Sequence, residues 1–153
     1  MSAVSCGSVG DVVGFAIEKE EKAMDFYRKC SERAINPGIR EFFREMVQEE
    51  QGHRDMLRNL DALDLDGVKL DKVEDLRISD YLIDVHFTED LTYQEALIIA
   101  MKKEEKAHAF YAGWKDRCVS EKAATLFAIL ENEEAKHKRK LENLYDEEIL
   151  TWD

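Results

Sequence analysis

Apolar residues recur along the chain at alternating steps of three and four, the spacing of helices that bury one face against each other. The pattern falls into four segments of helical length, and the stretches between them are polar or contain proline and glycine. Four helices in two pairs are therefore predicted. The first pair occupies about residues 9–62 and the second about residues 92–146.

Local signals support the ends of these helices. Asn36-Pro37-Gly38 separates the first two, with Asn36 suited to an N-cap and Pro37 to the first helical position. Thr92-Tyr-Gln-Glu95 has the form of a capping box, and Ser120 can cap the last helix. The predicted helices span about 10–33, 37–62, 92–118 and 120–146.

Residues 61–91 form the one long connection, and their number suits a crossover between helical hairpins rather than a tight turn. Residues 79–86 are suited to a short helix within it. Because each helix pair needs the other to bury its apolar face, we expect residues 1–153 to form a single domain. The predicted fold is an all-α four-helix bundle made of two hairpins.

The two halves of the chain are an internal repeat. When the sequence is shifted by 84 positions, residues 16–60 align without a gap on residues 100–144, with 16 identities in 45 positions. A Glu of the first helix precedes a Glu of the second by 30 residues in both halves, from 20 to 50 and from 104 to 134. The repeat predicts a bundle with internal two-fold symmetry.

Each apolar stripe is interrupted at mid-helix by a polar residue on the same face; Glu20, for example, stands between Ala16 and Ala23. Burying such carboxylates without partners costs several kcal/mol each, and they would repel one another. Neighbouring lysines fall on other faces, so two divalent cations are the partners that the pattern favours. The residues predicted to face the core and bind metal are Glu20, Glu50, His53, Glu104, Glu134 and His137.

The spacing of these residues indicates which metals they bind. One Glu from each of two helices, plus Glu-x-x-His from each of the other two, is the ligand pattern of di-iron and di-manganese bundles. Oxygen ligands with one imidazole per metal suit iron or manganese, and zinc fits on affinity alone. A polar layer or hydrated cavity is the structural alternative, but two copies of the motif at the same spacing favour the metal site.

Other polar residues carry weaker signals. Tyr27 and Tyr111 lie two turns beyond the acids of their helices and are expected in the core, with a hydrogen bond to a ligand carboxylate as the alternative. The signal for His108 as a ligand is weak, because its equivalent in the first half is Met24. We expect the remaining acids and histidine beside the stripes, on solvated faces or in the connection: Glu21, Glu49, Glu105, Glu133 and His86.

The sequence resembles the rubrerythrin branch of the ferritin-like superfamily over roughly residues 9–60 and 92–146. Glu-x-x-Ala-x-x-x-Tyr at residues 20–27 and 104–111, together with the two Glu-x-x-His motifs, carries the resemblance. It implies a di-iron site that reduces hydrogen peroxide, or reacts with dioxygen, by cycling between ferrous and ferric states. It also implies that Glu50 and Glu134 bridge the metals, with Glu20/His53 and Glu104/His137 as terminal ligands.

The chain departs from that family at two points. It contains no CxxC, so a separate donor, such as a rubredoxin-like protein, is expected to supply electrons. Ala107 stands where rubrerythrins carry an extra Glu, which predicts a more symmetric site. Iron storage or delivery, as in ferritin and bacterioferritin, is the alternative function, although Gln51 occupies the position of the haem-binding Met of bacterioferritin.

Net charge, terminal sequence and cysteine content indicate which binding partners and which cellular compartment to expect. The net charge is −12, so neither nucleic acid nor an anionic membrane is an expected partner. The first residues lack a signal peptide's pattern and no stretch is apolar enough to span a bilayer, so a cytoplasmic protein is expected, as a homodimer. Cys6, Cys30 and Cys118 are expected to be free or buried thiols.

Overall fold

The computed structural model describes residues 9–67, 70, 72–82, 92–117 and 120–147. Helices dominate these residues, as the hydrophobic pattern predicts. The elements in chain order are α1 (Val9–Arg33), α2 (Pro37–Arg58), the short 3-10 helices η1 (Leu60–Ala62) and η2 (Ile78–Tyr81), α3 (Tyr93–Lys115) and α4 (Glu121–Tyr145).

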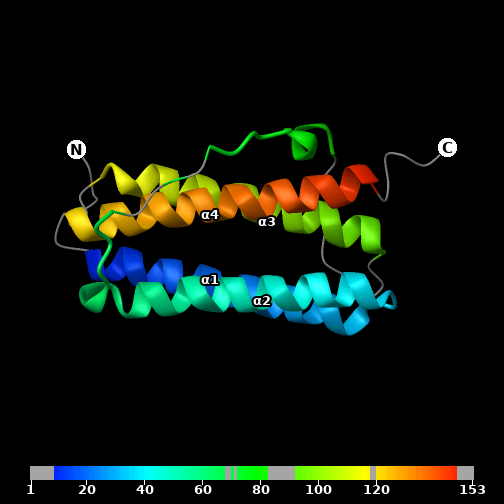
Figure 1. Ribbon diagram of the computed structural model, residues 1–153, viewed down its shortest axis with the longest axis horizontal. Helices are drawn as coiled ribbons and strands as arrows, with labels where there is room; N and C mark the ends of the chain where they lie inside the picture. The colour runs from blue at the N-terminus through cyan, green and yellow to red at the C-terminus, as the bar shows by residue number, and fades with distance from the viewer. Residues whose placement is uncertain (1–8, 68–69, 71, 83–91, 118–119, 148–153) are drawn as a thin grey trace.

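Two antiparallel hairpins make up the bundle: α1 packs against α2, and α3 packs against α4 (Figure 1). Because α2 and α3 run in the same direction, the chain between them must return along the bundle (Figure 1). The described part of this connection lies against α4, where Lys138 Nζ is 2.9 Å from Asp75 and Glu142 accepts the amide of Ile78 at 3.1 Å. The predicted all-α bundle with a crossover is confirmed.

The helices begin where the capping signals predict. Asn36 Oδ1 accepts the amide of Gly38 at 2.8 Å and opens α2. Thr92 and Glu95 form the reciprocal capping box of α3, with both bonds at 3.1 Å. Ser120 Oγ accepts the amide of Ala123 at 3.1 Å and opens α4.

Three boundaries differ from the prediction. The third helix ends at Lys115 rather than near residue 118. The second helix ends at Arg58 rather than near residue 62, because Asn59 turns its side chain back to the carbonyl of Asp55 at 2.9 Å and η1 follows. The short helix expected at 79–86 is the single turn of η2, and residues 83–86 lie outside the described part of the chain.

The core consists of two apolar clusters separated by a polar layer. One includes Tyr27, Phe43 and Leu141, and the other includes Leu57 and Phe127. Every helix passes from one cluster to the other, and the predicted polar positions fall at the crossing point. Large side chains buried in this way stabilise the fold by roughly 1.5–3 kcal/mol each, which offsets the cost of the layer between them. None of the described helices combines the length and apolar character needed to cross a membrane.

Candidate metal centre

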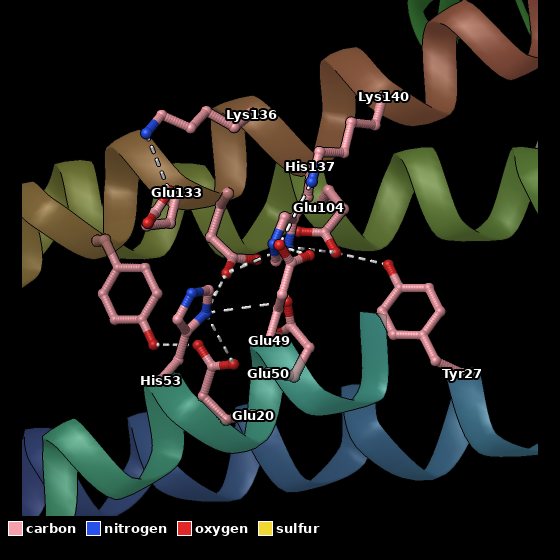
Figure 2. A network of polar contacts seen from close by, with 12 residues as sticks. Glu20, Tyr27, Glu49, Glu50, His53, Glu104, Glu133, Lys136, His137 and Lys140 are labelled. Carbon is pink, nitrogen blue, oxygen red and sulfur yellow. Dashed lines mark hydrogen bonds and ion pairs between the residues drawn. The ribbon is translucent and has the colours of Figure 1, made fainter. Parts of the chain in front are cut away.

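The six residues predicted to bind metal lie together at the middle of the bundle, and each is at most 7% exposed. Each helix supplies one Glu, and the second helix of each hairpin adds a His one turn further on (Figure 2). The imidazole rings of His53 and His137 face each other with centroids 5.3 Å apart and planes inclined by 16°. The carboxylates and imidazoles therefore converge from all four helices on one small volume.

Within this volume the ligand atoms form two overlapping groups. One contains Glu20 and His53, the other contains Glu104 and His137, and both contain Glu50 and Glu134. In each group, one candidate atom from every residue lies within 4.8 Å of the others. This geometry is compatible with two adjacent cation sites that share two carboxylates.

The polar atoms of the cluster lack regular hydrogen bonds and contact mainly one another. Among the described residues, each of the six side chains has a buried oxygen or nitrogen without a hydrogen bond. The two imidazoles lie against the shared carboxylates, with His137 Nδ1 2.7 Å from Glu50 Oε1 and His53 Nδ1 3.0 Å from Glu134 Oε1. Cations would satisfy all of the atoms without a hydrogen bond at once. The atoms are Glu20 Oε2, Glu50 Oε1, His53 Nδ1, Glu104 Oε2, Glu134 Oε1 and His137 Nδ1.

The charges of the cluster show why partners are needed. Burial, and then the negative charges of Glu104 and Glu20, raise the pKa of Glu50 well above its usual value. Burial and the neighbouring carboxylates raise the pKa of Glu134 in the same way. Burial alone would lower the pKa of His137, but the charge of Glu104 and the hydrogen bonds with Glu104, Glu49 and Glu50 together raise that pKa well above the usual value. Without metal, the cluster therefore retains protons that cations would displace.

Two tyrosines cross the bundle to hold the outer carboxylates. Tyr27 of α1 donates a hydrogen bond to Glu104 Oε1 of α3 at 2.5 Å, and Tyr111 of α3 donates to Glu20 Oε1 of α1 at 2.7 Å. Burial and the neighbouring carboxylates raise the pKa of both hydroxyls well above the usual value, so both remain donors. Tyr111 leaves Glu20 Oε2 3.7 Å from His53 Nδ1, whereas the Glu104 oxygen that Tyr27 holds itself lies 3.6 Å from His137 Nδ1. From the sequence, these hydrogen bonds are the alternative to plain packing of the two rings in the core.

Glu49 belongs to the site although its sequence position beside the apolar stripe suggested a solvated face. Its Oε2 lies 3.0 Å from His137 Nε2, while Nδ1 of the same ring faces Glu50 Oε1, and Lys140 is 3.3 Å from the Oε1 of Glu49 (Figure 2). The His137 contact lowers the pKa of Glu49 to about 2, although burial opposes this shift. The repeated Glu-Glu pair at 49–50 and 133–134 was the available signal for it.

The other weak candidates lie outside the cluster. His108 Nε2 is 3.6 Å from Glu131, and its side chain is 42% exposed. Glu21 pairs with Arg58 at 2.9 Å, and Glu105 accepts the Ser79 hydroxyl at 2.6 Å. Cys30 is buried, which raises the pKa of its thiol to about 12. Cys6, Cys118 and His86 lie outside the described residues.

The bundle and its cluster define a class: helical-bundle proteins whose buried carboxylates and histidines are compatible with a di-iron site. Within that class, the family model described as Rubrerythrin matches residues 11–145. The chain therefore belongs to the rubrerythrin family, as the sequence motifs predict. A search of curated proteins and a search of solved structures gave no match.

Proposed function

We propose that this chain is a di-iron oxidoreductase that reduces hydrogen peroxide or dioxygen in oxidative-stress defence. The observation that supports this most strongly is the pair of overlapping ligand groups that share Glu50 and Glu134. Two metals held side by side can deliver two electrons to one oxidant. A chain of the rubrerythrin family is a suitable setting for that chemistry.

The proposed ligand roles follow the two groups. Glu50 and Glu134, which belong to both groups, would hold both metals, while Glu20 with His53 and Glu104 with His137 would each complete one side. The ions, when bound, would cycle between ferrous and ferric states; manganese and zinc are the alternatives that the same ligands accept.

Residues around the ligands orient them and keep protons in place. Tyr27 and Tyr111 each hold one oxygen of a terminal Glu, which fixes the direction of the other oxygen. Glu49 accepts from His137 Nε2 and so leaves Nδ1 free to bind metal, as carboxylates commonly do for metal-binding histidines. The two apolar clusters exclude water on either side of the carboxylate layer.

The partners we propose are a separate electron-donor protein of the rubredoxin type and a second copy of the chain in a cytoplasmic homodimer. Each turnover with hydrogen peroxide takes up two electrons and two protons and yields water. The donor must therefore restore both electrons before the next oxidant reacts.

Rapid mixing of the diferrous protein with hydrogen peroxide tests the proposed activity. We expect the protein-bound iron to be oxidised much faster than free ferrous iron under the same conditions. Oxidation no faster than that of free iron would contradict the enzyme. Size-exclusion chromatography after iron loading separates it from storage, because a small oligomer with about two metals per chain is expected, whereas a large shell with a mineral core would support storage.

A further inference from the structure

A pocket of about 130 Å³ lies between α1 and α3 and reaches the carboxylate cluster. Its floor includes the buried carboxylates Glu20 and Glu104, and its wall includes Ala23 and Ala107, the two small residues that the repeat makes equivalent. The pocket therefore joins the proposed metal site to the surface. Its remaining charged wall consists of four lysines: Lys19, Lys22, Lys103 and Lys106.

These lysines form a two-fold set around the pocket. The 84-residue shift relates Lys19 to Lys103 and Lys22 to Lys106. The inner pair is held in place across the helix interface. Lys19 Nζ lies 5.3 Å from the Phe110 ring centroid, and Lys103 Nζ lies 5.2 Å from that of Phe26. The outer pair, Lys22 and Lys106, is exposed.

Their positive charge is not offset by direct partners. Within the described residues none of the four forms an ion pair, although Lys29 pairs with Asp25 at 3.1 Å on the same helix. Glu21, which lies beside this set in the sequence, is engaged by Arg58 at 2.9 Å. The chain as a whole has a net charge of −12, so four ammonium groups without ion pairs make the surface around this opening locally positive.

The charge state of the buried carboxylates beneath the lysines determines which ions the opening attracts. Two divalent cations would neutralise the four buried carboxylates, which leaves the lysines as the dominant charge at the opening. A pocket lined by one sign of charge concentrates the opposite charge, and such steering raises association rates by about 10–10³-fold. Once the centre holds metal, the same field repels further divalent cations.

We propose that Lys19, Lys22, Lys103 and Lys106 form an anion-selective entrance through which small inorganic anions reach the metal centre. This proposal rests on the proposed function, because the carboxylates must be neutralised by metal for the entrance to be net positive. It adds a ligand class, small anions of the size of azide or nitrate, to neutral dioxygen and hydrogen peroxide.

Azide binding to the iron-loaded protein tests the entrance. The association rate is measured by rapid mixing, from the absorption change on binding, at low and high salt. In the double variant Lys22→Glu/Lys106→Glu we expect the low-salt rate to fall roughly tenfold or more, because steering is reversed. Its salt dependence should also invert. The control Lys29→Glu/Lys72→Glu changes the net charge equally at exposed lysines outside the pocket and should keep the rate of the unmodified protein.

A second readout needs no redox chemistry. Nitrate added to the zinc-loaded protein should shift the nuclear magnetic resonance signals of the Ala23 and Ala107 amides, and the double variant should lose that shift. Metal content is measured in every variant.

The outcomes separate the two proposals. Full metal content with unchanged azide rates and nitrate shifts would overturn the entrance alone. A lower metal content with an unchanged azide association rate per bound metal would also overturn the entrance. It would mean that the lysines only offset the charge of the buried carboxylates. Failure of the unmodified protein to bind metal would overturn the proposed function and the entrance with it.

Discussion

The His137 half and the His53 half of the candidate metal centre contain equivalent ligand candidates but have different surroundings. His137 Nε2 lies 3.0 Å from Glu49, which Lys140 also contacts at 3.3 Å. Glu133, the equivalent of Glu49, instead pairs with Lys136 of its own helix at 3.4 Å (Figure 2). The tyrosine hydrogen bonds, by contrast, occur in both halves.

The sequence explains where the symmetry ends. Lys136 stands three residues after Glu133, within reach of an i, i+3 ion pair, whereas the equivalent position after Glu49 is Gly52. Glu49 therefore has no such neighbour on its own helix and reaches across to α4. The side chains inside the buried polar layer are therefore arranged alike in both halves. The contacts of Glu49 and Glu133, at the edge of that layer, depend on which basic surface residue lies within reach.

Removing the proposed shared ligands, Glu50 and Glu134, should lower metal content the most, because both halves of the proposed centre depend on them. We expect Glu50→Ala/Glu134→Ala to lose both metals and remain folded, since Ala favours helix and buried charge is removed. Elemental analysis and circular dichroism measure the two outcomes. A folded variant that retains its full metal content would refute the assignment of these ligands.

A comparison of Glu49→Gln with Glu133→Gln tests the difference between the two halves, which is the carboxylate contact to the histidine. Loss of the carboxylate behind a metal-binding His typically lowers affinity 10–100-fold, so Glu49→Gln should weaken one of the two metals by about that factor. Glu133→Gln should change neither. Competition titration with a chelator measures the metal affinities of both variants. Equal changes in affinity would contradict a special role for Glu49.

The tyrosines should behave alike, which is the symmetric counterpart of that test. Tyr27→Phe and Tyr111→Phe each remove one hydrogen bond to a buried carboxylate and should each lower the free energy of unfolding by about 1.5 kcal/mol. Urea unfolding of the metal-loaded variants measures this. A clear inequality between them would show that the two halves differ at the ligands as well.

The smallest expected change is in the free energy of unfolding of the metal-free protein, and here the substitution should stabilise the fold rather than destabilise it. The raised pKa values of Glu50 and Glu134 mean that the folded state binds protons that the unfolded chain releases. This stabilisation is complete below the usual Glu pKa of about 4.3 and is lost as pH rises through the raised values. Glu50→Gln should therefore stabilise the metal-free fold by about 1 kcal/mol at pH values above that loss.

Urea midpoints of the metal-free protein across this pH range provide the measurement. The variant should gain most at the alkaline end and nothing below the usual carboxyl pKa. A gain that is independent of pH would exclude ionisation of Glu50 as its cause.

The sequence predicts the inward-facing residues well because their signal is periodic and repeated. All six interruptions of the apolar stripes are buried, and the caps at Asn36, Thr92 and Ser120 are local features readable from a few residues. Glu49 was missed because its position depends on Gly52 and on Lys140 of another helix. Contacts between helices at the edge of a layer follow from packing rather than from periodicity.

Mössbauer spectroscopy of the iron-loaded protein, combined with the iron content per chain, tests the shared two-metal centre most directly. We expect two irons per chain whose oxidised forms are magnetically coupled, because Glu50 and Glu134 belong to both candidate ligand groups. Two uncoupled irons, or a single iron bound in one half, would contradict it.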